Sequence, residues 1–250
     1  MRNPWVLATA STVAFAGAGN AQAAGAPPVY SWTGFYVGVN VGAAGHEAAV
    51  QDLNGWGSTG QPPYVTPWFN SQKTTVSYGG QVGYNLQISN FVVGVEADLS
   101  YVGSSNTFIP PNTLAENCGT FCGVSATNEL TWLSTFRGRA GFAFDRIMIF
   151  GTAGAAVGQV NNHWGWGDRG FSDSQFSASG TRSGYVYGGG IELMLMPNWV
   201  LRAEGMHVDL GTSRSTIFGQ PFCCTAGPGT FTTEFKNVAN IGRLALSFRW

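Results

Sequence analysis

Charged residues make up only 10% of this 250-residue chain, so the places where they occur are informative. Eight of them lie in stretches where apolar and polar residues alternate, and each occupies the polar face: Glu96, Asp98, Arg137, Arg139, Glu192, Arg202, Glu204 and Arg243. If that face points into a narrow protein interior, the charges must pair, because an isolated charge away from water is costly. Four acids and four bases favour an ion-paired network that holds the interior shut. The alternative is a selectivity ring in a channel, for which an excess of one sign is more typical.

No convincing catalytic or cofactor-binding motif accompanies these charges. The chain has no GxxxxGK[ST] phosphate loop, no HExxH motif and no Cys/His array with zinc spacing. Its histidines are His46, His163 and His207, and nothing in the sequence places any of them beside a nucleophile; His207 and Asp209 are one candidate pair. One His/Asp pair is a weak signal for a hydrolase. We therefore predict no catalytic role, no metal and no cofactor.

Four cysteines, Cys118, Cys122, Cys223 and Cys224, fall in two polar segments. In an exported chain they are candidate disulfides, with three possible pairings. A vicinal bond between Cys223 and Cys224 would be strained. Binding of a soft metal is the less favoured alternative.

The N-terminus predicts export. Residues 1–3 include one basic residue, an apolar run follows to Ala18, and Ala21-Gln22-Ala23 has the small-x-small pattern of a signal-peptidase site. The run is too short for a membrane-spanning helix, which needs about 20 residues. We expect a signal peptide over residues 1–23, cleaved after Ala23, then a short periplasmic segment over residues 24–33.

The net charge of the chain is −1, so it provides no basic field that would attract nucleic acid.

Period-two alternation predicts β-strands throughout the remaining chain, residues 34–250. Eight segments show it: 34–45, 74–86, 91–101, 129–144, 147–158, 184–195, 200–210 and 238–250. The fifth is too rich in Ala and Gly for its faces to be assigned. In the seventh, Met206 continues the face of Arg202 and Glu204, so we expect a bulge near Gly205 or His207 to restore the pattern.

The connections alternate between tight turns and long polar segments of roughly 23 to 28 residues, as in outer-membrane barrels with short periplasmic turns and long extracellular loops. Strands of roughly 10 to 14 residues suit a tilted bilayer crossing, which needs about 9 to 11. Aromatic residues near the strand ends and uncharged apolar faces disfavour a soluble β-sandwich. The sequence predicts an all-β, eight-stranded, antiparallel up-and-down transmembrane barrel.

Four segments carry a resemblance to a known family: YSWTGFYVGVNVG, WLSTFRGRAGFAFDR, GGGIELMLMPNWVLRAEGMHVDLG and the terminal LALSFRW. Together they resemble the outer-membrane immunogenic proteins of alpha-class proteobacteria, small barrels of the "porin family". The resemblance implies an eight-stranded barrel that acts as a surface antigen and stabilises the envelope. In similar proteins the barrel-assembly machinery recognises a last strand that ends in an aromatic residue. Phe248 and Trp250 would take that part here.

We therefore expect a monomeric structural protein, exposed at the surface of the Gram-negative outer membrane, with outer-membrane lipid and the assembly machinery as partners. A narrow diffusion channel is the first alternative. A surface adhesin or ligand-binding protein is the second, acting through long loops such as HWGWGDRGF, residues 163–171.

Overall fold

The computed structural model describes residues 30–53, 69–108, 122–168, 174–219 and 229–250. These residues form eight β-strands. In chain order the strands are β1 (Gly34–Asp52), β2 (Phe69–Ile88), β3 (Phe91–Phe108), β4 (Cys122–Phe144), β5 (Ile147–Asp168), β6 (Ser174–Met196), β7 (Trp199–Gly219) and β8 (Gly229–Arg249).

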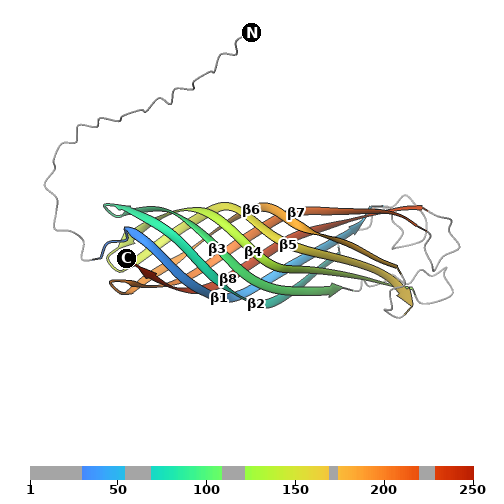
Figure 1. Ribbon diagram of the computed structural model, residues 1–250, viewed down its shortest axis with the longest axis horizontal. Helices are drawn as coiled ribbons and strands as arrows, with labels where there is room; N and C mark the ends of the chain where they lie inside the picture. Colours follow the sequence, from blue (N-terminus) through green and yellow to red (C-terminus); the bar gives the residue numbers. More distant parts are fainter. Residues whose placement is uncertain (1–29, 54–68, 109–121, 169–173, 220–228) are drawn as a thin grey trace, which may run out of the picture.

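The strands close into a barrel. Each pairs antiparallel with its neighbours in the sequence, and β1 also pairs with β8, from Tyr36 opposite Arg249 to Asp52 opposite Thr233. Figure 1 shows the tilted strands winding around one long axis. The predicted eight-stranded antiparallel barrel is confirmed.

One end of the barrel, called the turn end below, carries three two-residue turns and the C-terminus (Figure 1). Two of the turns contain a non-glycine residue with positive φ, Ser89 at 57° and Asp145 at 53°. Positive φ values match the tight turns whose twist suits β-hairpins. The opposite end is called the far end.

The strands are longer than the alternation predicts, at 18 residues in β3 and 23 in β4 and β6. Strand β2 has 20 residues. At about 3.3 Å per residue and a tilt of about 40°, a strand of this length rises about 50 Å, twice the ~25 Å apolar band of a membrane barrel. Toward the far end the outward residues become polar, because that part of the barrel is beyond the lipid. The pairing of β1 with β2 nevertheless continues to Val50 opposite Phe69.

The greater strand length also changes one predicted loop. Residues 163–168, expected in a loop, belong to β5.

The barrel is apolar outside and polar inside. Outward residues such as Val39 and Leu99 are 66% and 58% exposed, whereas inward Asn40 and Gln81 are 5% and 3% exposed. That inversion of the usual soluble pattern suits a wall surrounded by lipid. No helix in the described ranges is long and apolar enough to cross a bilayer.

The structure assigns the faces of β5 and corrects those of β7. In β5, Met148, Phe150 and Ala156 are buried inside. In β7 the predicted bulge near Gly205 or His207 is wrong, because pairing with β8 continues without a shift to Asp209 and slips only between Asp209 and Thr212. Met206 therefore points inward with its neighbours on that face, and it is 5% exposed.

Two apolar layers lie inside the barrel. The turn-end layer consists of Trp32, Val92, Ala143, Met148, Phe150, Met194 and Val200. The second layer, called the upper layer, lies nearer the far end. It consists of Ala44, Val102, Leu130, Leu133, Ala156, Val160, Val186, Met206, Val208, Leu210, Ala239 and Ile241. Along β3 the order is Val92, Glu96, Asp98 and Val102, so the charged residues lie between the two layers.

Candidate functional site: a charge network inside the barrel

The eight charged residues singled out from the sequence all point into the barrel, and each is at most 6% exposed. We call them the charge network. They come from five strands, β3, β4, β6, β7 and β8. They point inward because every second side chain of a strand lies on the same face. Strand register places three opposite-charge pairs directly across from each other: Glu96 and Arg137, Glu192 and Arg202, Glu204 and Arg243.

Arg137 is the centre of the network and is fully buried. Its Nη1 donates to Oε1 of Glu204 at 2.6 Å. Its Nη2 donates to Oδ2 of Asp98 at 3.0 Å and to Oε1 of Glu96. Arg137 on β4 thus joins carboxylates from β3 and β7, which are four strands apart and lie on opposite sides of an eight-membered ring.

The other three arginines connect the remaining carboxylates to this centre. Arg202 binds Oε1 of Glu192 through Nε and Oε2 of Glu96 through Nη1, both at 2.6 Å. Arg139 shares Glu192 Oε1 at 2.7 Å. Arg243 binds Glu204 Oε2 at 2.9 Å and Asp98 Oδ1 at 3.3 Å. Shared carboxylates make all eight residues one connected network.

Aromatic side chains that sequence reasoning did not include support the network. The Tyr36 hydroxyl donates to Glu96 Oε2 at 2.5 Å and accepts from Arg139 Nη1 at 3.1 Å. The Phe150 ring centre lies 4.3 Å from the guanidinium carbon of Arg139 and 5.4 Å from that of Arg202. Both separations are within cation–π range. Tyr36 already lay on the polar face of its segment, which was a usable signal, whereas Phe150 lay in the segment whose faces the sequence left unassigned.

A glycine leaves room for Tyr36. Gly83 of β2 is the register partner of Tyr36, and a Cβ on Gly83 would overlap the tyrosine ring. The tyrosine ring occupies the space that a side chain at position 83 would need, so the choice of glycine there and the position of Tyr36 depend on each other.

Residues before β1 cross the turn end. Trp32 is 1% exposed, its backbone N–H donates to Gln87 Oε1 at 2.7 Å, and its Nε1 donates to the Asp145 carbonyl at 3.3 Å. Gln87 also donates its backbone N–H to Thr33 Oγ1 at 2.9 Å. The indole therefore covers the turn end of the lumen, a placement that the sequence did not indicate.

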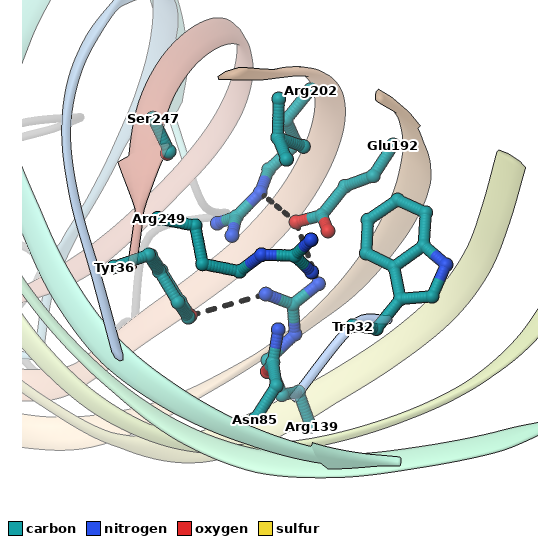
Figure 2. A pocket seen from close by; sticks show the side chains of 9 residues that line it. Trp32, Tyr36, Asn85, Arg139, Glu192, Arg202, Ser247 and Arg249 are labelled. Carbon is teal, nitrogen blue, oxygen red and sulfur yellow. Dashed lines mark hydrogen bonds and ion pairs between the residues drawn. The ribbon is translucent and has the colours of Figure 1, made fainter. Parts of the chain in front are cut away.

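Between the Trp32 indole and the charge network lies a small cavity (Figure 2). Arg139, Glu192 and Arg202 of the network line it, together with Arg249, which was not among the predicted residues. Arg249 follows the inward periodicity of β8, so its direction was readable from sequence, but its proximity to the network was not.

The predicted assembly residues lie on the outer surface at the turn end. Phe248 packs edge-on against Trp199, with ring centroids 5.4 Å apart, and stacks with Trp250 at 6.3 Å. The Trp250 backbone N–H donates to the Phe35 carbonyl at 3.2 Å. These aromatic side chains occupy the interface position typical of membrane barrels.

The structure gives His207 and Asp209 different partners. His207 Nδ1 is 2.8 Å from Asn240 Oδ1, whereas Asp209 accepts from the Tyr185 hydroxyl at 3.1 Å. His46 is buried inside the barrel and His163 lies in β5. Within the described ranges, no group of three His, Cys, Asp or Glu residues is arranged to hold a metal.

The cysteine predictions fall outside what the structure describes. Cys118, Cys223 and Cys224 are not among the described residues, and for Cys122, the first residue of β4, only the backbone is described. Their disulfide pairing stays a prediction.

Comparison with known proteins places the chain in a family. The family model described as outer membrane protein beta-barrel domain matches residues 9–231. The 31 kDa outer-membrane immunogenic protein of Brucella melitensis biotype 1 is 32% identical over 188 residues, which cover 73% of this chain and 72% of that protein. The 22 kDa outer membrane protein of Rhizobium leguminosarum bv. viciae is 30% identical over 191 residues, covering 76% and 69%.

Among solved structures, the outer membrane protease OmpT from Escherichia coli matches with a TM-score of 0.52, over 87% of this chain and 97% of that chain. Its 9% sequence identity shows a likeness of fold alone. The closed barrel, its apolar outer wall and the relatives agree on the cell outer membrane as the location. The chain belongs to the family of outer membrane proteins that have a β-barrel domain.

Proposed function

We propose that this protein is a structural, surface-exposed component of the outer membrane, that its lumen is closed by the charge network, and that it has no catalytic role. The observation that carries the proposal is the position of Arg137. It is 0% exposed, and it bonds to carboxylates from opposite sides of the ring. An ion crossing the barrel would have to separate these groups.

The apolar layers reinforce the closure. The turn-end layer and the upper layer lie on either side of the network, and their members are 0 to 6% exposed. A hydrated ion would lose its water shell at each layer, which is strongly unfavourable in a low-dielectric interior. Balanced signs within the network also provide no preference for cations or anions.

A closed lumen suits a protein whose work is mechanical. In an eight-stranded barrel, side chains fill the interior. Arg137 and Arg243 join non-adjacent strands, so the network ties the wall across its diameter. Breaking a buried ion pair by removing one partner costs about 3–5 kcal/mol, which makes such a wall resistant to deformation.

Surface exposure follows from the orientation of the family. Outer-membrane barrels have short turns in the periplasm, so the far end would face outward. The strands there continue beyond the lipid-facing band and would present their connections above the membrane. Relatives named as immunogenic support an equivalent display on this chain.

We also propose that the barrel works as a monomer assembled by the barrel-assembly machinery. Pairing of β1 with β8 leaves no open sheet edge among the described strands, and closure removes the usual route to edge-to-edge association. Phe248 and Trp250 stand on the lipid-facing surface at the turn end, where an assembly factor would reach them.

Conductance of refolded protein in planar bilayers tests the closure directly. We expect the wild type to be silent. A variant with Arg137→Ala and Glu96→Ala removes two central groups and should show openings if it folds. Arg214→Met is the matched control, because this arginine is 67% exposed. Stepwise currents in the wild type that change when Arg137 is neutralised would instead identify a channel.

A further inference from the structure

A fifth arginine lies inside the barrel beside the balanced network. Arg249 is 6% exposed, and its Nη2 donates to the Pro197 carbonyl at 3.3 Å and approaches Met194 Sδ at 3.5 Å. Its Nη1 is buried and has no hydrogen-bond partner in the described part of the chain. Its guanidinium carbon is 5.6 Å from the centre of the Trp32 ring, which does not neutralise the charge.

The buried charges of the described strands are therefore unequal. They comprise five arginines, namely the four of the network and Arg249, against the four carboxylates of Glu96, Asp98, Glu192 and Glu204. The carboxylates are already shared among the network arginines. The interior is left with an excess of one positive charge, located at the turn end.

The excess charge faces a cavity. Arg249, Arg139 and Arg202 line the cavity between Trp32 and the network, and Glu192 is the one carboxylate in its described lining. Figure 2 shows all three guanidinium groups directed toward it, with Glu192 bonded to Arg202 and to Arg139. The Ser247 hydroxyl also lines it and accepts from Gln81, and its own proton has no acceptor within the described strands.

We propose that this cavity binds one small monovalent anion of chloride size, held by Arg249 Nη1. The cavity is small, with room for about one water-sized group, which disfavours larger oxyanions. A water molecule would accept the hydrogen bond from Arg249 but leave the buried charge uncompensated. A monovalent anion would accept the hydrogen bond and also neutralise the charge. The Trp32 indole lines the same cavity, so a bound anion would lie between the indole and the charge network.

Thermal unfolding of the refolded barrel in detergent tests the site. Sodium chloride is compared with sodium gluconate at equal ionic strength, because gluconate is too large for the cavity. A ligand that binds only the folded state raises the unfolding midpoint. We expect the midpoint to be several degrees higher in chloride for the wild type. Arg249→Met should remove the difference, and the exposed-site control Arg214→Met should retain it.

Bromide provides a measurement that does not depend on the variant folding. In wild-type crystals soaked in sodium bromide, we expect one anomalous peak within hydrogen-bond distance of Arg249 Nη1. Equal midpoints in the two salts would overturn the proposal, as would a chloride effect that persists in Arg249→Met, or a cavity without an anomalous peak.

Discussion

Arg137 and Glu204 meet inside the barrel with their Nη1 and Oε1 atoms 2.6 Å apart, and neither side chain has any exposed surface. The two residues come from β4 and β7, which are not neighbours in the sheet. Such contacts connect strands across the lumen, whereas backbone hydrogen bonds connect only neighbouring strands. Stability and closure of the barrel should therefore depend on this pair and on the groups around it.

Replacing Arg137 by Met should lower the free energy of unfolding by about 3–5 kcal/mol, because a buried charge loses its partner. Glu96, Asp98 and Glu204 all share this guanidinium. Urea titration of the refolded barrel, followed by tryptophan fluorescence, measures the change. Arg214→Met is the control and should alter stability much less, because the Arg214 side chain, which pairs with Glu234, is 67% exposed. Equal effects from the two variants would show that the network does not stabilise the wall.

A double-mutant cycle tests the ion pair between Arg137 and Glu204 directly. Combining Arg137→Met with Glu204→Gln should give a coupling energy of about 0.5–3 kcal/mol, since groups in direct contact do not contribute additively. Arg137→Met combined with a change at Glu234 should give additive effects, because Glu234 pairs with Arg214 instead. Additivity in the first cycle would contradict the contact.

Gly83→Ala should destabilise the barrel by about 1–3 kcal/mol, since the added methyl group would overpack the space that the Tyr36 ring fills. Shifting Tyr36 also weakens its bonds to Glu96 and Arg139. Gly205→Ala is the matched control, because a Cβ there meets no atom within 4 Å in the described structure. Similar losses at both positions would point to a general glycine effect in strands.

Trp32→Ala separates two barriers. Removing the indole should cost about 3–5 kcal/mol of stability, as large-to-small changes in a packed core do. We nevertheless expect no current through planar bilayers, because the charge network lies deeper in the barrel and is unaltered. Currents through Trp32→Ala in planar bilayers would show that the indole, and not the network, closes the lumen.

Trp250→Ala should slow assembly more than it lowers stability. Its side chain is exposed on the outer surface, with 64% of its area accessible. Its removal takes away ring contacts with Phe35 and Phe248, so the unfolding free energy of refolded protein should fall by only about 0.5–1.5 kcal/mol. In cells we expect less of the folded, heat-modifiable form in outer membranes. Trp250→Phe keeps a terminal aromatic residue and should restore assembly, so failure of this variant would argue against aromatic recognition.

Much of the architecture was predictable from the sequence by itself. Alternation with a period of two is a local property, so the number of strands, their antiparallel order and the inward direction of Glu96, Arg137 and Arg243 were all readable from residue types. The scarcity of charge on the opposite face indicated lipid for the same reason. These inferences needed no knowledge of which strands meet across the lumen.

Only the tertiary structure decided the rest. The far-end parts of the strands lack a clean alternation because polar residues stand on the outward face there as well, so the length of the strands became visible only through pairing. Which carboxylate joins Arg137 depends on the stagger of the closed ring, and the same closure brings Arg249 beside Arg139 and places Trp32 over the turn end. Contacts across a lumen join residues far apart in the chain, and local periodicity carries no information about them.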